Sequence, residues 1–159
     1  TEGLDSGPVC ARAAEPIDAE DTYGTLAPRL EDLGAALLIR TLEESPPCAA
    51  QDDALATYAE KIVAEDRVLD PSRPAVGLER TVRALTPHIG AHAVLADGAR
   101  LGVRAARVLD DGPKPGELAL DGPLPVLGCA EGALELLVVQ PPGRRPMPGE
   151  DYLRGRRRS

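Results

Sequence analysis

Asp5 is the residue of this sequence whose surroundings most suggest chemistry. It lies near the start of the chain in Leu4-Asp5-Ser6-Gly7 and is enclosed by glycines at positions 3 and 7. A turn bounded by glycines can present a carboxylate to a reacting group, but Asp-Ser-Gly is also common wherever a loop needs a side-chain cap. The local sequence therefore leaves two interpretations of Asp5, an active-site carboxylate and a turn residue.

Arg144-Arg145 is a second candidate feature. The pair follows a Pro-Pro-Gly turn directly after the most apolar predicted strand. The planar guanidinium group of arginine can bind two oxygen atoms of a phosphate at once. We therefore predict phosphate binding by this pair, with a solubilising loop as the alternative.

The two histidines do not predict a metal site. His88 and His92 have the i, i+4 spacing of a zinc-binding helix, but Pro87 and Gly90 interrupt any such helix. A structural or surface role is therefore expected for both histidines, and no metal is expected in this chain.

The cysteines are odd in number and form no Cys-x-x-Cys pair. They lie at Cys10, Cys48 and Cys129. This usage is typical of reduced, mostly buried thiols in a cytoplasmic protein. No disulfide is expected.

Charge is unevenly distributed along the 159 residues. The net charge of −8 argues by itself against a nucleic-acid partner. However, residues 1–70 contain 5 basic and 16 acidic side chains, whereas residues 71–159 contain 13 basic and 10 acidic ones. A phosphate senses charges within a Debye length of about 8 Å, so the local basic excess matters more than the sum. No apolar run is long enough for a transmembrane helix, and no membrane partner is expected.

Three segments have the periodicity of amphipathic helices. The clearest has leucine at positions 26, 30, 33 and 37 and ends near Glu44, before a Ser-Pro-Pro run. A second covers residues 51–65. The third contains Leu78, Val82 and Leu85, with Ser72 as its expected N-cap.

Beyond residue 90 the pattern changes to short strands. Residues 91–96 and 99–109 flank Asp97-Gly98, a strong hairpin signal. Strands are also expected at 118–120, 125–129 and 133–139, and about five such strands close most economically as a small barrel. A weaker strand is expected within residues 6–17 and a short helix over residues 148–158.

Five ordered segments resemble the methionyl-tRNA formyltransferases. They are EGLDSGP at 2–8, IDAEDTYGTL at 17–26, ATYAEKI at 56–62, LERTVRALTP at 78–87 and VQPPGRRPM at 139–147. The resemblance implies that residues 1–48 are the C-terminal remnant of a Rossmann-like α/β formyltransferase domain and that residues 49–70 are a linker. Residues 71–159 would form an all-β, OB-like barrel with flanking helices that binds tRNA. The family's catalytic asparagine and histidine precede the matched region, so we interpret the chain as a fragment.

The resemblance also implies a reaction. A formyl group would pass from 10-formyltetrahydrofolate to the amino group of initiator methionyl-tRNA. The family's aspartate, matched by Asp5, orients the histidine and favours its charged form, while the asparagine and histidine stabilise the oxyanion. The fragment alone is expected to be inactive. Arg144 and Arg145, followed by Arg83 and Arg80, are expected to bind tRNA through phosphates and shape, because the chain has no Phe or Trp on which bases could stack.

Two other interpretations stay open. A sugar-nucleotide formyltransferase resembles this family in both domains and shares the Leu-Asp-Ser-Gly segment, although the Gln140–Met147 segment with its paired arginines favours the tRNA enzyme. A stand-alone RNA-binding module is a candidate from another class. In the preferred interpretation the protein is monomeric and cytoplasmic.

Overall fold

The computed structural model describes residues 3–156, which form two compact units. The first unit contains the residues up to 21 together with residues 25–62. The second contains residues 22–24 and the chain from residue 63 onward. The expected domain limits at residues 48 and 70 stay predictions.

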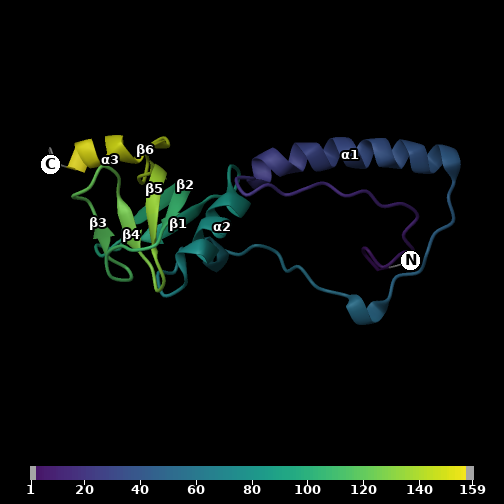
Figure 1. Cartoon of the computed structure of the whole chain (residues 1–159), viewed down its shortest axis with the longest axis horizontal. Helices are drawn as coiled ribbons and strands as arrows, with labels where there is room; N and C mark the ends of the chain where they lie inside the picture. Colours follow the sequence, from purple (N-terminus) through teal and green to yellow (C-terminus); the bar gives the residue numbers. More distant parts are fainter. Residues whose placement is uncertain (1–2, 157–159) are drawn as a thin grey trace. The chain divides into compact units, whose positions relative to one another are not determined.

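The second unit is built on one antiparallel sheet (Figure 1). Its strands are β1 (Ala91–Val94), β2 (Arg100–Leu109), β3 (Leu118–Ala119), β4 (Val126–Gly128), β5 (Ala133–Gln140) and β6 (Met147–Pro148). They are arranged in the order β1-β2-β5-β4-β3, and β6 pairs with β5. The expected strands of this region are therefore confirmed, with ends shifted by a few residues, and Asp97-Gly98 forms the turn between β1 and β2.

This sheet is open, and the barrel closure expected from the number of strands is not observed. Among the described residues, β1 and β3 lie at opposite ends of the strand order and do not pair with each other. The outer side of β1 is instead occupied by a short parallel bridge from Val68 to His92, where the Leu69 N–H donates to the His92 carbonyl at 2.8 Å. β3 has only two residues, so it offers too few backbone groups to complete a barrel.

The core of the second unit lies between the sheet and the helix α2 (Ala75–Leu85), which packs against β1, β2 and β5. Its buried positions recur at helical spacing, namely Ala75, Leu78, Val82 and Leu85. The predicted apolar face is thus confirmed. The predicted cap is wrong, because Pro74 occupies the N-cap position and the Ser72 hydroxyl donates to Asp70 at 2.8 Å.

The last helix, α3 (Gly149–Arg156), packs against β5 and β6. It buries Tyr152 and Leu153 against the sheet and confirms the helix expected near the end of the chain. The last residues of that expected helix, 157 and 158, lie outside the described residues.

The longest helix of the described residues, α1 (Tyr23–Glu44), belongs to the first unit from residue 25 onward. Its end at Glu44 agrees with the sequence prediction, and Pro28 lies within its first two turns. None of its residues is fully buried; Leu26, Leu33 and Leu37 are half-buried and Leu30 is exposed. The expected apolar face therefore exists but is only partly covered.

Two expectations for the rest of the first unit are wrong. Residues 51–65 form no α-helix; they contain the 3₁₀ turn η1 (Asp53–Leu55) and the first residue of a second 3₁₀ turn, η2 (Glu65–Arg67), which belongs to the second unit. Residues 51–64 are exposed, and a short helix without a packing partner is marginal in water. Residues 6–17 contain no described strand beyond a single antiparallel bridge between Val9 and Ala49.

That bridge explains a further correction, because Cys10 and Cys48 form a disulfide. Val9 and Ala49 exchange both backbone hydrogen bonds, at 2.8 and 2.9 Å. The next residues on each side therefore form a non-hydrogen-bonded pair, whose side chains lie closest together in an antiparallel ladder. Only Cys129 is a thiol in this structure, and it is buried as expected.

Candidate nucleic-acid interface

Asp5 lies on a tight turn in the first unit. Its φ angle of 57° is in the left-handed region, which is uncommon for residues other than glycine. The Gln51 side-chain amide holds this turn by donating to the carbonyl oxygens of Asp5 at 2.8 Å and Gly7 at 2.7 Å. The residue is exposed, and no histidine occurs among the described residues of this unit. The structure thus positions the backbone of Asp5, and its catalytic role stays a prediction.

Arg144 and Arg145 lie on the turn between β5 and β6. The Arg144 N–H donates to the Pro141 carbonyl at 3.1 Å, and Gly143 has a φ angle of 70°. These features are typical of a type II turn, which favours proline followed by a glycine with positive φ at its central positions. Both arginines are exposed to solvent.

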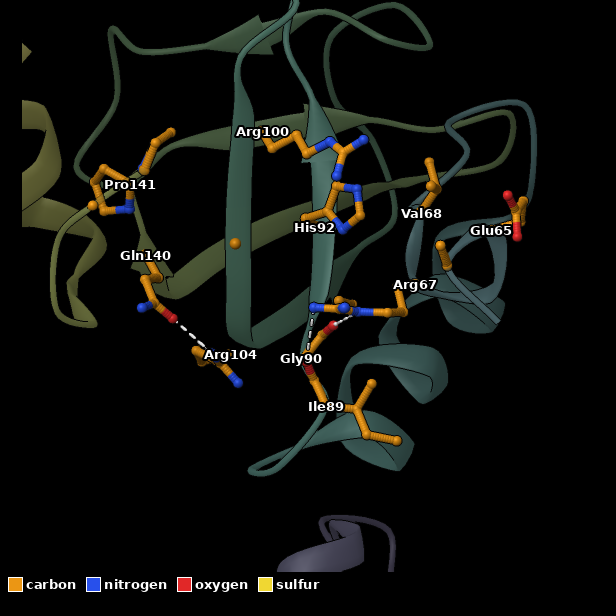
Figure 2. A pocket seen from close by; sticks show the side chains of 15 residues that line it. Glu65, Arg67, Val68, Ile89, Gly90, His92, Arg100, Arg104, Gln140 and Pro141 are labelled. Atoms are coloured by element: carbon orange, nitrogen blue, oxygen red, sulfur yellow. Dashed lines mark hydrogen bonds between the residues drawn. The ribbon is translucent and has the colours of Figure 1, made fainter. Parts of the chain in front are cut away.

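A hollow of about 330 Å³ lies next to this turn, over β1 and β2 and the end of β5 (Figure 2). At its centre Gly102 of β2 pairs with His92 of β1 on one side and with Gln140 of β5 on the other. Arg100 and Arg104 flank Gly102 along β2. Since glycine has no side chain, these four side chains surround a space rather than filling it. We name this feature the Gly102 hollow.

Three further segments complete the walls of the Gly102 hollow. They are residues 64–68 with Arg67, residues 89–91, and the proline-glycine part of the turn that carries Arg144, residues 141–143. Its charged lining residues are Arg67, Arg100 and Arg104 on the basic side and Glu65 on the acidic side. The lining is therefore basic even though the whole chain is acidic.

The guanidinium groups of Arg67 and Arg104 are held by uncharged acceptors. Arg104 donates to the side-chain oxygen of Gln140 from Nε at 3.1 Å and from Nη2 at 2.7 Å, and from Nη1 to the Pro87 carbonyl at 2.9 Å. Arg67 donates to the carbonyls of Gly90 at 3.1 Å and Ile89 at 3.0 Å. Within residues 3–156, none of the three hollow arginines forms an ion pair with a carboxylate. The positive charges of Arg67 and Arg104 are therefore held in place by hydrogen bonds without being neutralised.

Two local features let Arg104 take this position. A register shift between β2 and β5 leaves Arg104 as an extra residue between Val103 and Ala105, and such bulges re-aim side chains. Gly90 has a φ angle of 75°, and a Cβ atom on it would lie 2.5 Å from Nη1 of Arg104. A side chain at residue 90 would therefore displace the guanidinium group.

His92 contributes a polar but mostly neutral side chain to the Gly102 hollow. Partial burial lowers its pKa below the ordinary value of 6.5, and the positive charges of Arg100 and Arg67 lower this pKa further. At neutral pH the net charge of the hollow therefore comes from its arginines.

The two arginines predicted on α2 do not line the Gly102 hollow. Arg83 donates from Nε to Glu79 at 2.7 Å, so a carboxylate one helical turn away offsets its charge. Arg80 is exposed. Of the predicted tRNA-binding residues, only Arg144 and Arg145 belong to the turn that borders the hollow.

Sequence reasoning missed Arg67, Arg100, Arg104 and His92. The alternation of Arg100 and Arg104 with buried Leu101 and Val103 was a readable signal, because alternate residues of a strand share a face. No comparable signal links these residues to Arg67 or Gln140, since that proximity depends on strand register.

The described residues contain no group of three or more potential ligands arranged to hold a metal ion. Nor does any helix found among residues 3–156 have the length and apolar character needed to cross a membrane.

Residues 61–157 match a known protein family, described as formyl transferase, C-terminal domain. The chain belongs to this family. Among its curated relatives, the methionyl-tRNA formyltransferase of Paracoccus denitrificans is 40% identical over 96% of this chain and 50% of its own length. That of Pseudomonas paraeruginosa is 42% identical over 98% of this chain and 51% of its own length. The chain thus spans about half the length of these relatives.

Solved structures of HypX from Aquifex aeolicus share the fold of this family member. A multiply substituted HypX variant superimposes with a TM-score of 0.69 at 19% identity, covering 100% of this chain and 29% of HypX. HypX in complex with tetrahydrofolic acid superimposes with a TM-score of 0.65 at 19% identity, covering 96% of this chain and 28% of HypX. At this level of identity the similarity concerns the fold alone.

Proposed function

We propose that this chain supplies the C-terminal half of a methionyl-tRNA formyltransferase. The whole protein would transfer a formyl group from 10-formyltetrahydrofolate to the amino group of initiator methionyl-tRNA. The observation that carries this proposal is the identity of 38–42% to proteins of that name, which extends over nearly the whole chain. A continuous match through both units favours a shared activity over a shared domain alone.

The reaction assigns different tasks to the two units. The methionyl nitrogen attacks the formyl carbon, the bond from that carbon to N10 of the folate breaks, and the proton lost by the amine is balanced by one gained at N10. In the first unit Asp5 would orient a histidine supplied by the upstream half of the protein and favour its charged form. That histidine would stabilise the developing oxyanion. In the second unit Arg144 and Arg145 would hold tRNA phosphates, with Arg80 and Arg83 as further contacts.

The organisation of the whole protein belongs to the same proposal. Residues 1–48 would end a Rossmann-like catalytic domain, residues 49–70 would link it to the next, and residues 71–159 would be the tRNA-binding domain built on the open sheet. The exposed apolar side chains of α1, such as Leu38, Ile39 and Leu42, support this arrangement, because the remainder of a catalytic domain would cover them. The whole protein would act as a cytoplasmic monomer.

A formylation assay tests the proposal. Purified chain, and the same chain joined to its upstream half, are incubated with 10-formyltetrahydrofolate and initiator methionyl-tRNA. We expect no formylation by the chain alone and formylation by the longer protein. Asp5→Asn in the longer protein should lower kcat by about 10²- to 10⁴-fold with little change in tRNA affinity, because its carboxylate acts through the charged histidine of the transition state.

The matched control for Asp5→Asn is Asp53→Asn, which makes the same chemical change on an exposed residue of the same unit. It should keep normal turnover. Near-normal turnover of Asp5→Asn would reduce Asp5 to a turn residue. Formylation of an amino-sugar nucleotide in place of methionyl-tRNA would overturn the proposed function.

A further inference from the structure

The Gly102 hollow has the chemistry of an anion site, and the proposed function has so far given it no role. We propose that it binds one phosphate group of the tRNA backbone, separately from the Arg144–Arg145 turn. The proposal deepens the proposed function and rests on it for the identity of the RNA.

Shape is the first argument. The hollow holds about 330 Å³ because Gly102 leaves an empty place between His92, Gln140 and the two flanking arginines. Ligand pockets begin at about 300 Å³, so the space suits one phosphate with its attached sugar rather than an extended small molecule. Figure 2 shows that Arg100 and His92 lie on one side of the hollow and that Arg104 and Gln140 lie on another.

The second argument is charge. Three arginines against Glu65 give the lining a net charge of +2 with neutral His92. Arg67 and Arg104 are already oriented by carbonyl and amide oxygens, so binding an anion costs little additional side-chain entropy. Each guanidinium carries more N–H donors than these bonds use, and those donors can bind phosphate oxygens.

Continuity with the Arg144–Arg145 turn favours a polyanion over a free phosphate ion. The Gln140 side chain accepts the hydrogen bonds from Arg104 and also donates from Nε2 to the Arg144 carbonyl at 3.0 Å. One side chain therefore links the two basic features. An RNA strand that places one phosphate in the hollow can place a neighbouring phosphate at the turn.

The composition of the walls indicates what is recognised. The lining contains no Tyr, and the chain contains no Phe or Trp, so no aromatic platform other than His92 is present for a base. The hollow would therefore contribute affinity and orientation rather than sequence reading, as phosphate contacts generally do.

The test is a salt titration of tRNA binding to the 159-residue chain and two variants. Arg100→Gln removes a charge from an exposed side chain that forms no ion pair among residues 3–156. Gly102→Leu fills the hollow without changing the charge; a Cβ atom there meets the Cβ and the backbone oxygen of Gln140 at 3.1 Å, so Gln140 must move by a few tenths of an ångström. The matched control is Arg107→Gln, which removes the same charge from the same strand outside the hollow, where Arg107 pairs with Glu135.

We expect both hollow variants to reduce the slope of log K against log salt by about 0.7 to 0.9, the value of one phosphate contact, and to weaken binding about 5- to 10-fold near 0.1 M salt. Arg107→Gln should leave the slope within error of wild type. Circular dichroism and thermal unfolding serve as the folding controls. If Gly102→Leu loses its fold, Gly102→Ala and Arg100→Gln decide the outcome.

Inorganic phosphate distinguishes the source of the anion. The NMR signals of the arginine side chains are followed during titration with phosphate and with tRNA. Phosphate should shift the signals of Arg104 only weakly, whereas tRNA should shift them strongly. Unchanged slopes in both hollow variants, tight binding of phosphate alone, or no tRNA binding by the wild-type chain would each overturn the proposal. Formylation by the longer protein is measured separately, so loss of the phosphate site and failure of the proposed function give different results.

Discussion

Replacing Gln140 with glutamate changes the charge at the Gly102 hollow while keeping most of its hydrogen bonds. Gln140 accepts from Nε and Nη2 of Arg104 and donates to the Arg144 carbonyl. A carboxylate keeps both bonds from Arg104 and loses the donation. The net charge of the lining falls from +2 to +1, because the new carboxylate neutralises Arg104.

The expected effects on stability and on binding differ in size. A solvent-accessible ion pair adds about 0 to 1 kcal/mol of stability, and the lost hydrogen bond costs about 1 kcal/mol, so the free energy of unfolding should change by less than about 1 kcal/mol. Neutralising one phosphate-binding charge should lower the salt slope by about 0.7 to 0.9 and the affinity for tRNA about 5- to 10-fold near 0.1 M salt.

The assay is fluorescence anisotropy of labelled tRNA at several salt concentrations, with urea unfolding followed by circular dichroism. Gln51→Glu is the control for the added charge, because Gln51 is the other glutamine of the chain and lies outside the hollow; this change loses the donations to Asp5 and Gly7 in the first unit but leaves the hollow unaltered. The reasoning is refuted if Gln140→Glu binds tRNA with a wild-type salt slope, or if Gln51→Glu weakens binding equally.

Three further predictions concern stability and redox state. Leu78→Ala should destabilise the second unit by about 2 to 5 kcal/mol, because Leu78 is fully buried, whereas Val76→Ala on the same helix, where the side chain is 47% exposed, should cost less than about 0.5 kcal/mol; equal urea midpoints would contradict the packing. In Cys10→Ser the Cys48 thiol should become free to react, which alkylation and mass spectrometry of the non-reduced chain will detect. Alkylation of both Cys10 and Cys48 in the non-reduced wild-type chain would exclude the disulfide. Arg29→Gln should raise the pKa of Asp21, measured by carboxyl NMR, because the paired bonds from Arg29 hold that pKa well below its ordinary value of 3.8. The stability contributed by Asp21 is present above pH 3.8 and is lost as the pH falls toward the lowered pKa. The helical content of the wild type should therefore fall more on acidification than that of Arg29→Gln.

Sequence patterns correctly predicted the elements that are stabilised by residues close together in the sequence. The apolar face of α2 and the Asp97-Gly98 hairpin depend on residues close in sequence, and both are present in the structure. The pattern over residues 51–65 failed although its periodicity was similar, because Tyr58 and Ile62 are left exposed rather than packed against other described residues. Periodicity indicates a helix only where a partner surface covers its apolar face.

The candidate sites were less predictable from sequence for a related reason. Arg144 and Arg145 could be singled out because they are adjacent and follow a turn. Arg67, Arg104 and Gln140 meet only through the pairing of β2 with β5 and the path of residues 64–68, which have long sequence separations. The disulfide was missed in the same way, since the Val9–Ala49 bridge that aligns its cysteines joins segments forty residues apart.

The open sheet has a consequence for self-association. Unpaired strand edges are templates on which further chains can add, and closed barrels avoid this hazard by having no edges. Here the outer side of β1 is bridged by Val68, and β3 presents only two residues at the other edge. An intruding strand would find few consecutive N–H and C=O groups at the outer side of β1 or of β3, so these two edges offer little template for self-association although the sheet is not closed.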